Sequence, residues 1–124
     1  MKIFTVEEAD RLVLVIRPKL ERLKFLYERV ADLRDHAKAA ASASGSGGGM
    51  VGGMSYVKML YEIGKLTTEI GELGVELKDY SRGLVDFPSL RSGRVILLCW
   101  QLGDSNEIEW WHETEAGFAG RQRL

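Results

Sequence analysis

The chain has one cysteine, Cys99, and two prolines among its 124 residues. A single cysteine excludes an intramolecular disulfide, and it excludes a metal site built from cysteines alone. Cys99 lies inside the apolar run VILLCW at 95–100, which is typical of a protein from a reducing, cytoplasmic compartment. The sequence also lacks a P-loop, a serine nucleophile elbow and a CxxC pair. No standard catalytic motif therefore indicates a reaction.

An excess of charge of either sign is also missing. The 17 Lys and Arg residues nearly balance the 18 Asp and Glu residues, which leaves a net charge of −1. Nucleic acids and anionic membranes select basic surfaces, so neither is expected as the main partner. The longest apolar runs, at 12–16 and 95–100, are too short to span a bilayer. The acidic N-terminal segment does not resemble an export signal, so we expect one cytoplasmic domain covering 1–124.

The first part of the chain has the apolar spacing of an amphipathic helix. Thr5 and Glu8 have the three-residue spacing of a capping box, and apolar residues then recur every three or four positions. These features predict a helix over 4–40, in which Pro18 is expected to cause a kink or to leave a short first helix. The segment 41–54 is rich in glycine and serine, and it is predicted to be a flexible tip.

A second helix is predicted over 55–82, with Gly83 as its stop. Its apolar residues alternate at intervals of three and four, as in a coiled coil: Tyr56, Met59, Ile63, Leu66, Ile70, Leu73, Leu77 and Tyr80. Such a narrow seam needs a partner helix, and the nearest one is the first helix, so the two are expected to form an antiparallel hairpin. A second copy of the chain could complete a four-helix layer, which favours a homo-oligomer, and in particular a dimer.

After Gly83 the pattern changes to that of strands. Three runs rich in β-branched and aromatic residues lie between 84 and 116, and the turn sequences RSGR and GDSN separate them. They predict a three-stranded antiparallel meander, followed by a tail at 117–124. The fold class is therefore predicted to be α+β, with a long antiparallel helical hairpin packed on a three-stranded antiparallel β-meander.

The turns also set the register of the predicted sheet. Asp86 is expected opposite Cys99, and Leu97 opposite His112, which places Asp86, Cys99 and His112 on one face. All three side chains are of metal-ligand types. However, the outer strands of a three-stranded sheet lie about 10 Å apart, too far for one ion to bridge easily. The favoured interpretation is therefore that no metal site exists, and this trio is the alternative.

His112 is also a candidate for acid–base chemistry. A histidine beside an acid titrates near neutral pH, and Asp86 and Glu115 are the candidate catalytic partners. The competing interpretation, which is the favoured one, is a buried, hydrogen-bonded histidine, an aspartate bonded to the turn near Pro88 and a solvated glutamate.

Arginines around the predicted sheet are candidates for binding a small anionic ligand. If the tail folds back, Arg121 could approach Arg91 or Arg94 and form a fork for a carboxylate or phosphate. Trp100 could supply a flat platform for the same ligand. The competing interpretation, which is the favoured one, pairs these arginines with the neighbouring glutamates and packs the tryptophan in the core.

Four stretches of the chain resemble the bacterial family catalogued as domain of unknown function 2203. They are FTVEEADRLVLVIRPKLERL at 4–23, GLVDFPS at 83–89, LCWQLG at 98–103 and WHETEAGFAGRQ at 111–122. The resemblance spans the chain except its glycine-rich tip, and Asp104 stands where the family usually has glutamate. It implies a set of motif positions, Asp86, Trp100, His112, Gly117, Gly120 and Arg121, but it implies no activity and no cofactor.

Two functions are compatible with these features. The favoured one is a small binding or assembly module that self-associates through its helices, its sheet or both. The alternative is a small-molecule or metal-dependent enzyme with its site around His112, Asp86 and Arg121. The absence of standard motifs favours the first function, and the dense C-terminal motif supports the second.

Overall fold

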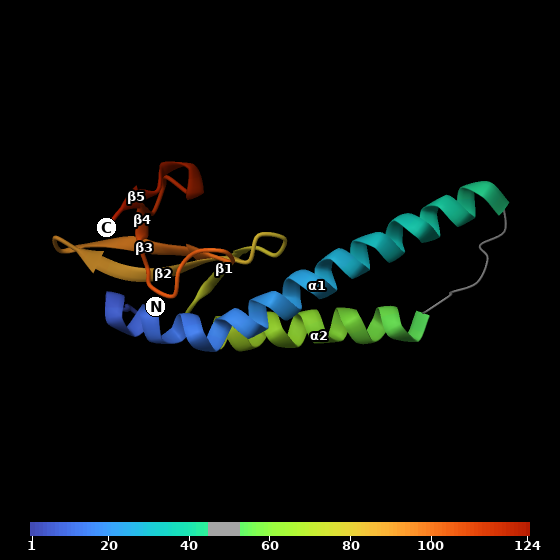
Figure 1. Cartoon of the computed structure of the whole chain (residues 1–124), viewed down its shortest axis with the longest axis horizontal. Coiled ribbons are helices and arrows are strands. Elements are labelled where there is room, and N and C mark those ends of the chain that lie inside the picture. Colours follow the sequence, from blue (N-terminus) through green and yellow to red (C-terminus); the bar gives the residue numbers. More distant parts are fainter. Residues whose placement is uncertain (45–52) are drawn as a thin grey trace.

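The computed structural model describes residues 1–44 and 53–124, which form a helical layer beside an antiparallel sheet. The predicted glycine-rich tip falls largely on residues 45–52, outside the described residues. The elements are α1 (Val6–Ser44), α2 (Gly53–Glu72), β1 (Glu76–Asp79), β2 (Leu84–Arg91), β3 (Arg94–Gln101), β4 (Trp110–Glu113), the short helix η1 (Phe118–Gly120) and β5 (Gln122–Arg123). Figure 1 shows the sheet between the start of α1 on one side and η1 on the other. The class is α+β, as predicted.

Helix α1 begins at the predicted capping box and continues without a break. The Thr5 amide donates to Glu8 Oε1 at 2.8 Å, and the Glu8 amide donates to Thr5 Oγ1 at 3.1 Å. Pro18 lies inside the helix, so the expected short first helix was wrong. A proline removes the bond to the carbonyl four residues earlier. Pro18 and Leu14 are both on the exposed side of α1, where water can replace that bond.

The second helix ends ten residues earlier than predicted, because Gly74 turns the chain. Its φ of +89° lies in the left-handed region that favours glycine, and a Cβ there would lie 2.9 Å from Lys2 Cβ. The chain then forms strand β1, which replaces the last part of the predicted helix. Leu77 and Tyr80 still pack against the core, but they do so from β1 and the turn after it.

Helices α1 and α2 pack side by side next to the sheet, and α1 continues well beyond this region (Figure 1). Ile16, Leu20 and Leu23 of α1 are fully buried, as is Ile70 of α2. Ion pairs lie along the edge of this contact, with Lys19 Nζ 2.7 Å from Glu69 Oε2 and Arg22 Nε 2.7 Å from Glu62 Oε2. None of the helices in the described ranges is long and apolar enough to cross a membrane.

The sheet has five antiparallel strands in the order β1-β2-β3-β4-β5, so the predicted three-stranded meander was too small. Its central register is nevertheless the predicted one. Asp86 pairs with Cys99 across β2 and β3, and Leu97 pairs with His112 across β3 and β4. The tight turn at 92–93 has positive φ at both residues, 52° and 78°, as a type I′ hairpin requires.

The two faces of the sheet have different surroundings. One face is packed against the helices and contributes Val85, Phe87, Ile96, Leu98, Trp100 and Trp111 to the main hydrophobic core. The other face carries Asp86, Cys99 and His112, and the segment around η1 covers part of it (Figure 1). The loop before β4 is longer than predicted, because the Ile108 amide is held by Asp10 Oδ1 at 2.7 Å instead of joining the sheet.

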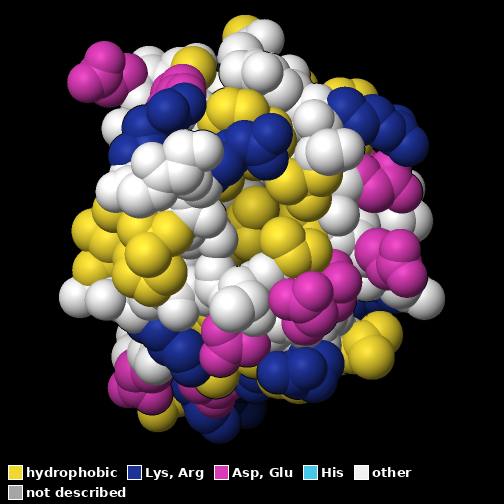
Figure 2. Space-filling model, turned by 90° about the vertical axis from the view of Figure 1, so that its left-hand side faces the viewer, with side chains coloured by type: hydrophobic (Ala, Val, Ile, Leu, Met, Phe, Trp, Pro, Cys, Tyr) yellow, Lys and Arg dark blue, Asp and Glu magenta, His cyan; other side chains and the backbone are white. Residues whose placement is uncertain are grey.

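Figure 2 views the end of the molecule that carries the turn between β2 and β3. Basic, acidic and hydrophobic side chains are interspersed on this face, and charge of neither sign dominates it. This face therefore carries no continuous stripe of basic side chains.

Candidate metal centre

Three side chains of different chemistry converge on the sheet face that points away from the helices. Asp86 comes from β2, Cys99 from β3 and His112 from β4. Their potential ligand atoms, a carboxylate oxygen, the sulfur and an imidazole nitrogen, all lie within 4.8 Å of one another. The three residues are 3%, 0% and 2% exposed, respectively. Three neighbouring strands therefore assemble a buried cluster in which every member can bind a metal.

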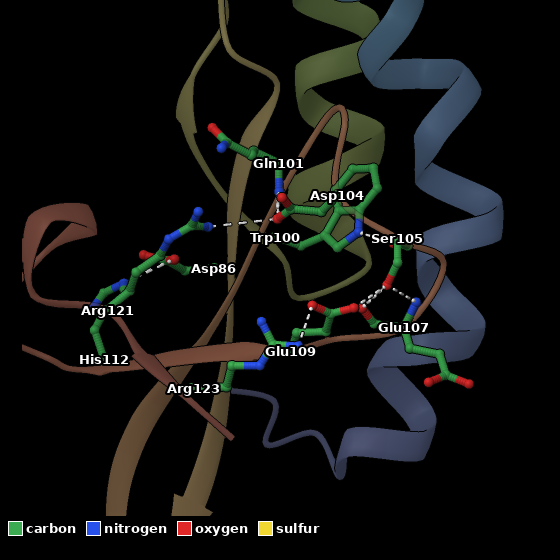
Figure 3. Close-up of polar contacts among 10 residues, drawn as sticks. All are labelled: Asp86, Trp100, Gln101, Asp104, Ser105, Glu107, Glu109, His112, Arg121 and Arg123. Atoms are coloured by element: carbon green, nitrogen blue, oxygen red, sulfur yellow. Dashed lines mark hydrogen bonds and ion pairs between the residues drawn. The ribbon is translucent and has the colours of Figure 1, made fainter.

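His112 reaches Asp86 across the central strand. Its Nε2 atom lies 3.1 Å from Asp86 Oδ1, as Figure 3 shows. The expected separation of these two side chains was wrong, because the side chains lean toward each other across the roughly 10 Å between their strands. Asp86 also bonds the histidine, instead of the turn near Pro88 that the competing interpretation required.

The backbone determines which nitrogen of His112 faces this cluster. Nδ1 lies 2.8 Å from the carbonyl oxygen of Glu113. A carbonyl only accepts hydrogen bonds, so Nδ1 must carry the proton. In the neutral ring Nε2 then has a lone pair, and this lone pair faces an oxygen of Asp86 that is also an acceptor when ionised. A positive charge must therefore lie between the two atoms, either a proton or a metal ion.

Burial makes the anionic forms of this cluster costly. Desolvation raises the pKa of Asp86, although the charge of His112, its hydrogen bond and Lys78 oppose the rise. Burial also raises the pKa of the Cys99 thiol to about 11, with a further contribution from the charge of Asp86. Arg121 opposes this second rise through its charge and hydrogen bonding. A bound cation would relieve the same penalty for both anions.

Arg121 approaches the cluster from the C-terminal tail. Its guanidinium lies 4.4 Å from the ring centres of both Trp110 and Phe118. Its Nη1 atom is buried 3.6 Å from Asp104 Oδ2, the contact drawn in Figure 3, and it has no hydrogen-bond partner among the described residues. An N–H group in this position could donate a hydrogen bond to the sulfur of Cys99 when the thiol is ionised. The thiolate is a much stronger acceptor than the neutral thiol.

A cavity of about 200 Å³ opens beside the cluster. It is lined by Lys78, Leu84, Asp86, Leu97, His112, Thr114, Gly117 and Phe118. Two of the three cluster residues, Asp86 and His112, thus form part of its wall. The volume is below the roughly 300–1,000 Å³ of typical ligand pockets, so the cavity suits a small molecule.

The family model described as Uncharacterized conserved protein (DUF2203) matches residues 2–124, which is nearly the entire chain. The chain belongs to this family. A search of curated proteins and a search of solved structures each found no match.

The other candidate residues of the DUF2203 protein lie in different surroundings. Trp100 is completely buried in the core on the helix side of the sheet, and its Nε1 donates to the carbonyl oxygen of Ser105 at 2.8 Å. It therefore cannot serve as a platform for a ligand in the cavity. Glu115 is exposed in the turn after β4, and it is not among the cavity-lining residues.

The arginines do not share one anion-binding fork in the described contacts. Arg94 Nε donates to Glu113 Oε2 at 3.2 Å, and Arg91 lies over the Trp111 ring at 4.6 Å. Arg121 is the only one of the three that approaches the cluster. The competing interpretation paired these arginines with neighbouring glutamates, and Arg94 does pair with Glu113.

The sequence interpretation did not identify Lys78, Thr114 and Phe118 as wall residues. Lys78 lay inside the predicted second helix, where its side chain had no relation to Asp86. Lys78 and Glu76 are two residues apart, so on a strand they lie on the same face of the sheet. This spacing would have indicated the position of Lys78 if β1 had been predicted. Phe118 and Thr114 lie in the tail and turn, whose irregular backbone has no periodicity to interpret.

Proposed function

We propose that the DUF2203 protein is a small metal-dependent enzyme. In this proposal Asp86 Oδ1, Cys99 Sγ and His112 Nε2 bind one divalent transition-metal ion, with zinc as the best chemical fit. The single observation that supports it most is the convergence of these three ligand atoms within 4.8 Å of one another. The backbone bond to Nδ1 adds support, because metal-binding histidines are usually oriented through their other nitrogen.

The distances suit a tetrahedral ion after a small adjustment. Two ligands each about 2.1 Å from such an ion lie about 3.4 Å apart, and the His112–Asp86 distance of 3.1 Å is close to this value. The widest separation in the cluster is no more than 4.8 Å, so small side-chain rotations would bring all three ligands into range. Mixed nitrogen, sulfur and oxygen ligands favour zinc over magnesium or calcium, which prefer oxygen alone.

Three protein ligands leave a fourth position for water or substrate, as in catalytic zinc sites. The cavity beside Asp86 and His112 is the space from which a small molecule would reach that position. A zinc ion there would polarise a carbonyl or phosphoryl group, or lower the pKa of bound water. We therefore propose hydrolysis or hydration of a small substrate as the reaction class.

Metal analysis tests this proposal directly. Metal-free protein titrated with Zn²⁺ or Co²⁺ should bind one equivalent, and Co²⁺ should give a near-UV thiolate charge-transfer band. Cys99→Ser should lose that band, and His112→Gln should lose most of the affinity. At a hundredfold excess of Zn²⁺ over Kd, the free energy of unfolding should rise by about 2.7 kcal/mol.

The chain offers a matched control in His36→Gln, because His36 is exposed on α1. This variant should bind metal like the unmodified protein. The proposal fails if the folded protein takes up no metal and saturating Zn²⁺ leaves its unfolding temperature unchanged. In that case the proton between His112 and Asp86 is the structural one of a buried ion pair.

Self-association is a second proposal, and it is compatible with the first. Val57, Leu60 and Tyr61 of α2 are 58%, 43% and 75% exposed, and a Cβ at the neighbouring Gly64 would meet nothing within 4 Å. An apolar helix face with a glycine can approach a second helix closely, which favours a homodimer. Tyr61→Glu should shift the sedimentation coefficient toward that of a monomer. An unchanged coefficient for Tyr61→Glu, or a monomeric unmodified protein, contradicts this proposal.

A further inference from the structure

We propose that the cavity binds a small oxyanion, a carboxylate or a phosphate, through Lys78 and Thr114 beside the metal position. This inference extends the proposed function by naming the class of ligand, and its metal-bound form rests on that function. Lys78 and Thr114 line the same cavity as the cluster residues Asp86 and His112. An ammonium group and a hydroxyl group would then meet the ligand from the wall.

Strand alternation directs Lys78 toward this cavity, because Lys78 lies two residues after Glu76, which pairs with Asp86. Leu77 pairs with Val85 and Asp79 pairs with Leu84, so Lys78 is the extra residue of a bulge in β1. Bulges are frequent next to active sites. The neighbours Leu77 and Lys78 point to opposite faces of the sheet, since Leu77 packs against the core while Lys78 lines the cavity.

The present partner of Lys78 is easily exchanged. Lys78 Nζ lies 3.0 Å from Glu76 Oε1, and the two side chains are 45% and 41% exposed. An ion pair at this exposure contributes little to stability and is screened by salt. A ligand oxyanion that reached Lys78 from the cavity would therefore displace Glu76 at small cost.

The rest of the wall suits a small anion with a short apolar part. A divalent ion held by the carboxylate of Asp86 and a Cys99 thiolate is neutral overall, which leaves Lys78 as the cation of the wall. Leu84, Leu97 and Phe118 reduce the water around it, and less water strengthens an ionic hydrogen bond. Arg82 adds a second positive charge, because its guanidinium lies 3.8 Å from the centre of the Phe118 ring.

Calorimetric titration of the zinc-loaded protein with inorganic phosphate and with acetate tests the inference. Lys78→Gln should weaken binding of the preferred anion by about tenfold or more, since hydrogen bonds to charged groups are among the stronger ones. Glu76→Gln should strengthen it, because the lysine loses its competing partner. Thr114→Val should weaken it by a smaller factor. If the Lys78–Glu76 ion pair had only a structural role, Lys78→Gln and Glu76→Gln would change the anion affinity in the same direction.

Lys65→Gln, which removes an exposed positive charge on α2, is the matched control and should leave anion binding unchanged. The inference is overturned if Lys78→Gln binds both anions like the unmodified protein, or if Lys65→Gln weakens binding as much as Lys78→Gln does. A loss confined to phosphate or to acetate identifies which oxyanion the wall prefers, and supports it.

Zinc content measured on each variant separates the two proposals. If the unmodified protein binds no zinc, the proposed metal function has failed, and the same titrations on metal-free protein still test Lys78. If zinc is retained by Lys78→Gln while anion binding is lost, the inference is supported independently of any effect on the metal ligands.

Discussion

His112 lies on β4 and Asp86 on β2, yet the imidazole Nε2 and a carboxylate oxygen meet 3.1 Å apart across the strand between them. The other ring nitrogen is held by the Glu113 carbonyl. These two contacts leave Nε2 as an acceptor that faces an acceptor unless a cation lies between them.

The Asp86→Asn substitution should abolish metal binding without unfolding the protein. The new amide N–H can donate a hydrogen bond to Nε2, so neither an additional proton nor a metal ion is needed between the residues. Without zinc, the variant should unfold at the same temperature as the unmodified protein or above it, because a buried ionised group is removed. Calorimetry and zinc stoichiometry measure the two effects. Zinc affinity equal to that of the unmodified protein would rule out Asp86 as a ligand.

Cys99 should be almost unreactive in the native, metal-free protein. Burial raises the pKa of its thiol to about 11, so at pH 8 about one thiol in a thousand is ionised. The reactive thiolate forms only as the pH rises through 11, and the residue is fully buried. A thiol-specific chromogenic reagent should therefore label Cys99 quickly only in guanidinium. Rapid, complete labelling of the folded protein would show that the thiol is accessible.

Two glycine substitutions should have opposite effects on stability. Gly74→Ala should destabilise the protein by about 1–3 kcal/mol, the cost of a left-handed conformation in a residue with a Cβ, and its Cβ would crowd Lys2. Gly71→Ala should stabilise it by about 0.5–1 kcal/mol, because Gly71 lies in α2 with open space around it. Urea unfolding measures both changes. Similar losses for both variants would contradict the assignment of Gly74 as the helix stop.

The ion pairs between the helices should make stability depend on pH in the acid range. Hydrogen bonds from Arg22 and Lys19 lower the pKa values of Glu62 and Glu69, respectively. Each folded-state pKa is thus below its unfolded value, so the stabilisation is present above the unfolded pKa. It is lost as the pH falls through the folded pKa. Replacing Glu62 and Glu69 by glutamine should make the free energy of unfolding depend less steeply on pH in the acid range. An unchanged slope would contradict the prediction.

The central sheet could be predicted because local chemistry determines its register. The turn at Ser92 and Gly93 allows one hairpin geometry, and from it the pairing of Asp86 with Cys99 follows by counting. The contact between Asp86 and His112 could not be obtained in this way. It depends on how two side chains lean across the central strand, and strand spacing alone says nothing about that direction.

The end of α2 was misplaced for a different reason. Leu73, Leu77 and Tyr80 continue the helical spacing of the preceding residues, and Leu77 and Tyr80 do pack against the same core. An apolar pattern reports which side chains are buried, but it does not report the backbone that carries them there. Strand β5 was missed because two exposed residues at a sheet edge have no pattern at all.

Trp111 and His112 are adjacent in the chain, and they point to opposite faces of the sheet. Trp111 belongs to the core beneath the helices, whereas His112 belongs to the cluster on the other side. A slip of β4 by one residue would exchange them. The register of β4 therefore determines both the core beneath the helices and the cluster on the other side, since such a slip would put an indole among the ligands and an imidazole into the apolar layer.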